Sequence, residues 1–191
     1  MKFPKVLSLL LMFLSVKTYA QSDLAAVTDV TPAILTWMKH LNNEADKYLI
    51  PEKISDLSLH FGQLKQNLSS YMKARKSLSD SLLRNNIKPG NKNPDNLEML
   101  KTKMGAVMEQ MRNVADLASN NLRREGDNLN EQIYDILYGQ EGHYLSNLEA
   151  FLAGLDVSKR DLAVNGSASY SRLEECVNLI SAIQGKIERK K

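Results

Sequence analysis

The stretch DILYGQEGHYL, residues 135–145, contains Glu141 and His143, whose residue types carry out general acid and base catalysis. Such a site needs a second catalytic group within hydrogen-bond distance, and the sequence offers no identifiable partner for either residue. The two glycines of the stretch supply what a connector needs, a helix cap and a turn between two apolar helical patterns. We therefore interpret 139–143 as a bend, and an enzyme site there is the weakest of three functional hypotheses.

Aromatic side chains are concentrated on both sides of this bend. If they are buried, they fix the corner between two helices, which is the interpretation we favour. If they are exposed, they form a recognition surface, because tyrosine is enriched at protein interfaces. The candidate partner-binding residues of that second interpretation are Tyr134, Tyr138, His143, Tyr144 and Phe151.

Ser70 and Lys73 have the Ser-x-x-Lys spacing, which lets a lysine amine reach a serine hydroxyl one helical turn away. Penicillin-recognising enzymes with this spacing also need Ser-Asp-Asn and Lys-Thr-Gly motifs, and neither motif occurs in the chain. The sequence also lacks a Gly-x-Ser-x-Gly elbow and a glycine-rich phosphate loop. We therefore assign no catalytic residue and expect that the protein is not an enzyme.

Helical bundles can hold haem or a metal ion between inward-facing methionine and histidine side chains. Met104, Met108 and Met111 share one helical face, but methionine at this spacing ordinarily fills gaps in a core. His40 and His60 align with polar neighbours, so both are expected on polar faces. We assign no cofactor and no metal ligand, and a bundle that carries haem, metal or lipid remains the second hypothesis.

The elements that must position these residues are all predicted to be helices, because apolar residues recur at spacings of three and four and no strand pattern occurs. A Thr-Pro start predicts a first helix over about 32–49, and a nearly unbroken apolar seam predicts a long second helix over 54–85. A third helix is expected to start at Pro94, to kink or end near Gly126, and to continue its apolar face to Tyr138. The remaining elements are the bend, a short helix over 145–155, a loop over 164–169 and a last helix.

These patterns predict an all-α fold, in which residues 21–191 form one elongated antiparallel bundle of four or five helices with a long central helical hairpin.

Arg75 interrupts the apolar seam of the second helix, and such an interruption often specifies the register of the helices or a partner. Cys176 is the only cysteine, so no internal disulfide can form. We expect its thiol to be buried in the core rather than to link two chains.

Residues 1–20 have the pattern of a secretory signal peptide, with Lys2 and Lys5 before an apolar run over 6–16 and a small-residue cleavage site ending at Ala20. The run is shorter than the roughly 17 to 25 residues of a membrane-spanning helix, so we do not expect an integral membrane protein. Three of the 25 basic residues and none of the 22 acidic ones lie in this segment, so the remaining chain is electrically balanced. This balance gives no support to nucleic-acid binding, and the mature protein is expected to be periplasmic or secreted.

The favoured function is that of a structural or interaction subunit of a cell-envelope assembly, with protein partners there and homo-oligomerisation as an open alternative. The order of segments is similar to that of the small helical pilus-tip subunits of type IV secretion and conjugation machines. Both have a signal peptide, a Val27-Thr28-Asp29 stretch leading into the first helix, and a long helical hairpin. This resemblance implies a more specific alternative, a pilus-tip-like subunit.

Overall fold

The computed structural model describes residues 30–90, 94–118, 123–124, 126–128, 131 and 144–191. The signal-peptide segment, the Val-Thr-Asp trio, the bend at 139–143 and three of the candidate partner-binding residues, Tyr134, Tyr138 and His143, lie outside this description. Within the described ranges the chain is helical and has no β-strand. The labelled elements are α2 (Thr31–Asn43), α3 (Ala45–Tyr48), the 3-10 helix η2 (Pro51–Lys53), α4 (Ile54–Leu83), α5 (Pro94–Leu117), α7 (Tyr144–Leu152) and α8 (Lys159–Glu188).

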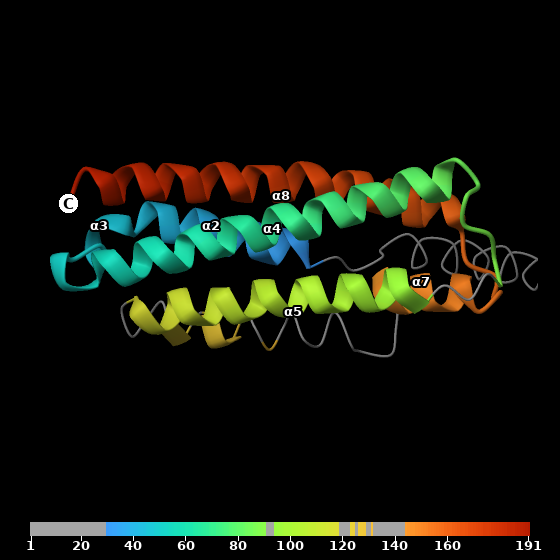
Figure 1. Cartoon of the computed structure of the whole chain (residues 1–191), viewed down its shortest axis with the longest axis horizontal. Coiled ribbons are helices and arrows are strands. Elements are labelled where there is room, and N and C mark those ends of the chain that lie inside the picture. The colour runs from blue at the N-terminus through green and yellow to red at the C-terminus, as the bar shows by residue number, and fades with distance from the viewer. Residues whose placement is uncertain (1–29, 91–93, 119–122, 125, 129–130, 132–143) are drawn as a thin grey trace, which may run out of the picture.

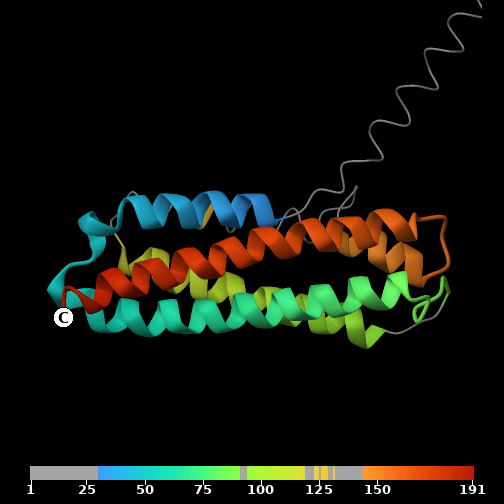
Figure 2. The ribbon, with the colours of Figure 1, turned by 90° about the horizontal axis from the view of Figure 1, so that it is seen from above.

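The helices lie nearly parallel to one long axis, with α4 between α5 and α8 (Figure 1) and α2 beside α8 (Figure 2). The chain direction reverses from α4 to α5, since Asn67 Nδ2 donates to the carbonyl of Ala106 while Lys53 Nζ donates to that of Leu117. A helix of 30 residues such as α4 is about 45 Å long at the usual rise per residue. The predicted fold class, an elongated antiparallel bundle with a long central hairpin, is confirmed.

The core follows the seams read from the sequence, because the residues that recur at three and four positions are those that become buried. The α5 seam includes Met104 and Met111, both fully buried, with Met108 packed against the core from its edge. Cys176 is also fully buried, as expected. The largest contributions from α4 and α8 are Leu57, Phe61, Leu64, Leu68, Tyr71, Leu78, Leu82, Leu162, Leu173, Ile180, Ile183 and Ile187.

The predicted loop over 164–169 is wrong, because α8 is one helix that runs through these residues. A Cβ atom added to Gly166 would lie 1.7 Å from Ser79 Oγ and 3.0 Å from Ser79 Cβ, so the glycine lets α8 approach α4 closely. The polar neighbours Asn165 and Ser169 are used in contacts with α4 rather than in a turn. Tertiary packing therefore outweighs the weak helix propensity of this segment.

The third helix ends earlier than predicted, because α5 stops at Leu117 rather than near Gly126. The predicted continuation of its apolar face to Tyr138 lies largely outside the described residues. Gly126 lies against Ala115, to which a Cβ on the glycine would come within 2.5 Å. Eleven residues of continuous helix would instead separate these two positions by about 16 Å. Lys53 Nζ, from the start of α4, donates to the Leu117 carbonyl at 2.7 Å and so caps the end of α5.

The first predicted helix is divided at Glu44 into α2 and α3. Lysines of the last helix bind the carbonyl groups at this end of the bundle, since Lys186 Nζ donates to the Asn42 carbonyl at 2.7 Å and Lys190 Nζ donates to that of Leu49 at 3.3 Å. Lysine near a helix C-terminus also offsets the partial negative charge there. Among the helices that the structure describes, none combines the length and apolarity needed to cross a bilayer.

Candidate functional site

The most distinctive group of side chains in the described structure surrounds Arg75, which is 1 % exposed on the inner face of α4. Its Nη1 donates to Tyr71 Oη at 3.0 Å, one turn earlier on α4. Its Nη2 donates to Asn165 Oδ1 at 2.9 Å and to Ser169 Oγ at 2.8 Å, both on α8. Hydrogen bonds from a charged donor are stronger than neutral ones, so the guanidinium fixes α8 at one position along α4.

The helix α7 joins this cluster through an aromatic contact. The Arg75 guanidinium carbon lies 3.8 Å from the centre of the Tyr144 ring and 5.7 Å from that of Tyr71. A cation over the face of an aromatic ring is attracted by the negative potential of the face. Arg75 therefore connects α4, α7 and α8, and the chain of bonds extends to Ser79, whose hydroxyl donates to the Arg75 carbonyl at 3.0 Å.

The chemistry open to this cluster is that of a structural junction. Arginine stays protonated at all physiological pH values, so Arg75 cannot act as a general base. The hydrogen-bond partners named above are a phenol, an amide and a hydroxyl, all neutral. A polar group in an apolar seam can select one helix register over its alternatives, because other registers leave it without its hydrogen bonds.

Two of the candidate partner-binding residues lie in the core. Tyr144 is 4 % exposed and Phe151 is 1 % exposed, and α7 carries both on the face that it packs against the bundle. Aromatic residues that fix the corner between two helices would be buried in this way. In the folded chain neither side chain is available to a partner, so a recognition surface has to come from other residues.

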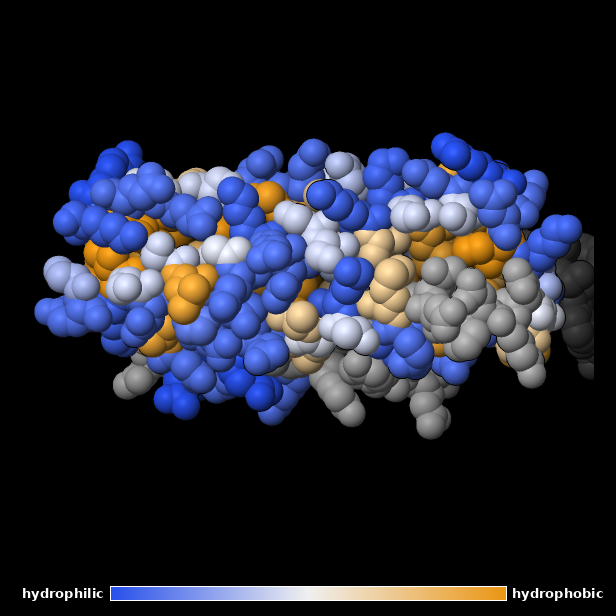
Figure 3. Space-filling view, in the orientation of Figure 1, coloured by the Kyte–Doolittle hydropathy of each residue, from blue (hydrophilic) through white to orange (hydrophobic). Residues whose placement is uncertain are grey.

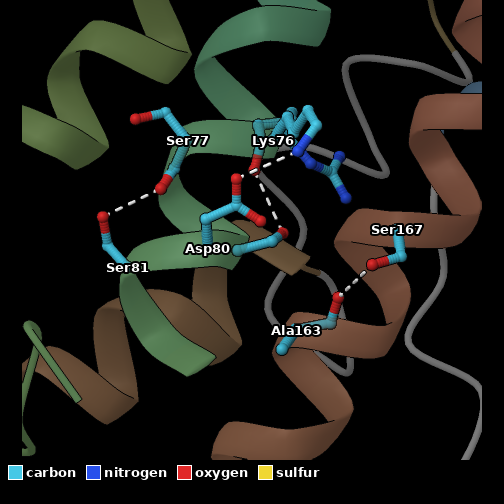
Figure 4. Close-up of polar contacts among 8 residues, drawn as sticks. Lys76, Ser77, Asp80, Ser81, Ala163 and Ser167 are labelled. Carbon is cyan, nitrogen blue, oxygen red and sulfur yellow. Dashed lines mark hydrogen bonds and ion pairs between the residues drawn. The ribbon is translucent and has the colours of Figure 1, made fainter. Parts of the chain in front are cut away.

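A second polar feature lies on the outer face of α4. It is an open groove of about 310 Å³. Lys76 Nζ lies 3.0 Å from Asp80 Oδ2, and Ser81 Oγ donates to the Ser77 carbonyl at 2.8 Å. Figure 4 shows these residues on α4 with Ala163 and Ser167 of α8 on the other side of the view. The lining residues are Lys73, Lys76, Ser77, Asp80, Ser81, Arg84 and Asn86.

The Ser-x-x-Lys spacing is not used as a pair. Ser70 Oγ accepts a hydrogen bond from Lys103 Nζ of α5 at 2.6 Å, whereas Lys73 is exposed and lines the groove. The bond to Lys103 joins α4 to α5. The sequence motif therefore marks a contact between helices of the central hairpin.

The histidines of α2 and α4 are both partly exposed. His60 Nδ1 lies 3.0 Å from Gln110 Oε1 of α5, so its ring makes a contact between helices. In the ranges that the structure describes, no group of three or more His, Cys, Asp or Glu side chains is placed to hold a metal ion.

Cys176 and Tyr48 are buried acids, and burial raises the pKa of both. Desolvation, with a smaller contribution from Glu175, raises the pKa of the Cys176 thiol to about 12, against about 8.5 in an unfolded chain. Between these values the unfolded state has released the thiol proton and the folded state has kept it. The unfolded state then binds fewer protons, so the free energy of unfolding falls as pH rises.

We expect Cys176→Ala to flatten this alkaline loss of stability over the range from about pH 8.5 to about pH 12. Urea unfolding at a series of pH values measures how steeply the free energy of unfolding falls with pH in the wild type and in Cys176→Ala. Tyr48, whose pKa is also raised, contributes equally in both proteins. If the free energy of unfolding falls equally steeply with pH in both proteins, the pKa of the Cys176 thiol is not raised by folding.

Sequence reasoning identified Arg75 as unusual but did not find Asn165 and Ser169. The signal that could have found them is their spacing of four, which places both on one helical face once 164–169 is taken as helix. A comparison of the chain with known protein families, with curated proteins and with solved structures found no match.

Proposed function

We propose that the protein is a non-catalytic, exported helical-bundle subunit that works through protein contacts in a cell-envelope assembly. The observation that supports this proposal most is the exposure of apolar side chains from separate elements at one end of the bundle. Leu83 is 57 %, Leu155 is 62 % and Val164 is 58 % exposed. The end of α4, the end of α7 and the start of α8 all lie at that end (Figure 1).

Large apolar side chains gathered in one region of a surface are more typical of a binding surface than of a solvent-exposed face. On the face drawn in Figure 3, hydrophilic residues cover most of the surface, and apolar residues emerge near this end and also at the opposite end. A hydrogen bond joins the segment after α4 to the end of α7 there, because the Gly90 N–H donates to the Phe151 carbonyl at 3.3 Å. A surface built on ordered loops loses little conformational entropy when a partner binds.

Export is the second part of the proposal and is supported by the sequence of residues 1–20 alone. It implies that the protein isolated from cells starts at Gln21. N-terminal sequencing of the protein from a periplasmic or culture fraction measures this. A product that retains Met1 and stays in the cytoplasmic fraction would contradict export.

The partner is tested by in-cell crosslinking of the full chain with a C-terminal tag, followed by mass spectrometry of the crosslinked peptides. We expect one dominant envelope protein, joined to residues near Leu83, Leu155 or Val164. A Leu83→Asp/Leu155→Asp variant should lose these crosslinks, whereas Leu59→Asp, at a leucine 58 % exposed in the other half of α4, should keep them. Crosslinks between copies alone, or none, would rule out a heteromeric assembly.

The pilus-tip-like subunit of a type IV secretion or conjugation machine is the more specific form of the same proposal. The feature in its favour is the long antiparallel pair α4 and α5, which matches the helical hairpin expected from the order of segments. Its test is the identity of the crosslinked protein, which should then be a component of such a machine.

A further inference from the structure

The groove on the outer face of α4 lies directly beside the exposed apolar end of the bundle. Arg84 and Asn86 line the groove, and Leu83 precedes them in sequence with 57 % of its side-chain surface exposed. The groove also contains Lys76 and Lys73, about two and three turns before Arg84 on α4. It therefore extends the proposed binding surface from the end of the bundle along its side.

The charges in the groove are unbalanced in favour of cations. Lys73, Lys76 and Arg84 face one acid, Asp80, and this acid is already paired with Lys76 at 3.0 Å. Within the described part of the chain, neither Lys73 nor Arg84 has an ion-pair partner. Two exposed cations at opposite ends of a groove attract a ligand that carries negative charge along its length.

The shape of the groove selects among anionic ligands. Lys73 and Arg84 are eleven positions apart on one helix, which corresponds to about 16 Å along its axis. One phosphate group cannot contact both. A peptide segment of about three helical turns or about five extended residues spans this distance.

From this charge and shape we infer that the groove binds an acidic segment of a protein partner, laid along α4 with an apolar residue of the partner against Leu83. The inference rests on the proposed function and adds the chemistry of the partner. The carboxylates of the segment pair with Lys73, Lys76 and Arg84, and Ser77 and Asn86 supply neutral hydrogen bonds along the groove.

The test places a photo-crosslinking benzophenone amino acid at Ser81 of the full, exported chain in the cells that make it. Ser181 of α8 is the matched control position, because both serines lie on helices and donate to the carbonyl four residues earlier, at 2.8 Å and 2.9 Å. We expect an adduct from position 81 to a net-negative segment of another protein, and no such adduct from position 181.

The charge dependence is tested with Lys73→Glu/Lys76→Glu/Arg84→Glu in the chain that carries the crosslinker at 81. Losing three exposed charge pairs together predicts an about tenfold loss of the adduct. The control Arg112→Glu/Arg189→Glu/Lys191→Glu makes the same change in net charge at exposed positions outside the groove and should keep the adduct. Equal circular dichroism melting curves for the two triple variants show that both fold.

Four results would overturn the inference: an adduct to lipid, an adduct to a second copy, an adduct to a segment without net negative charge, or no adduct at 81. Equal loss in the two triple variants would overturn it as well. If the tagged chain still crosslinks to an envelope protein through the bundle end, the proposed function survives and only the groove assignment fails. If neither experiment finds a protein partner, both fail.

Discussion

Replacing Arg75 with alanine is expected to lower the free energy of unfolding by about 3 to 5 kcal/mol, the range for deleting a large buried side chain. Two effects contribute to this loss. The substitution leaves a cavity between α4, α7 and α8, and it removes the donor that binds Tyr71, Asn165 and Ser169. Buried polar atoms that lose their hydrogen-bond partner each cost about 1 to 3 kcal/mol. Urea unfolding followed by circular dichroism measures the change.

Arg75→Met separates the two effects, because methionine fills most of the volume but offers no donor. We expect it to recover about half of the stability lost in Arg75→Ala, since buried charged groups can be replaced by apolar ones of similar volume at modest cost. Asn165→Ala is the converse variant, which keeps the guanidinium and removes one acceptor, at a cost of about 1.5 to 3 kcal/mol. A stability of Arg75→Ala within error of the wild type would contradict the junction.

Gly166→Ala and Gly185→Ala are expected to change stability in opposite directions, although both make the same substitution within α8. At Gly166 the new Cβ would meet Ser79 Oγ at 1.7 Å and Cβ at 3.0 Å, so α8 must move away from α4. Overpacking of this kind costs about 1 to 3 kcal/mol. At Gly185 nothing lies within 4 Å of the added Cβ, and alanine should stabilise the helix by about 0.5 to 1 kcal/mol.

Thermal unfolding of the two variants beside the wild type measures both changes. The midpoint should fall for Gly166→Ala and rise for Gly185→Ala. If both midpoints rise, α8 does not approach α4 closely at Gly166 and residues 164–169 are not packed as described. The pair thus tests the corrected boundary of α8 independently of Arg75.

The sequence predicted the fold class because the apolar seams are long. A residue such as Leu64 or Ile180 recurs with its neighbours at helical spacing over many turns, and that repetition outweighs local exceptions. Cys176 was placed correctly for the same reason, since it shares the seam of Leu173 and Ile180. These predictions depend on local periodicity alone.

The errors arose where a contact between distant residues decides the local structure. Asn165, Gly166 and Ser167 have weak helix propensity, but α4 offers Arg75 and a surface that only a glycine can approach. The end of α5 at Leu117 is likewise stabilised by Lys53, which is 64 positions away. The spacing of Asn165 and Ser169 becomes informative only once 164–169 is taken as helix, and no pattern near Leu117 marks its contact with Lys53.

The candidate site was predictable only in part. Arg75 stands out in the sequence because it is a charge in an apolar seam, and Tyr144 was selected with its aromatic neighbours. That Tyr144 lies over the Arg75 guanidinium follows from the packing of α7 against α5 and α8, which the periodicity of the sequence does not specify. The groove on α4 has no sequence motif, because exposed lysines are common on helices.

The proposal that this chain is an interaction subunit is tested most directly by native mass spectrometry of the protein purified, without crosslinking, from the cell fraction that contains it. The expected mass is that of a chain starting at Gln21 in a complex of fixed stoichiometry with a different polypeptide. A chain found alone, or only with copies of itself, would contradict the proposal. A mass that includes haem, a metal ion or lipid would also contradict it and would favour the ligand-carrying bundle.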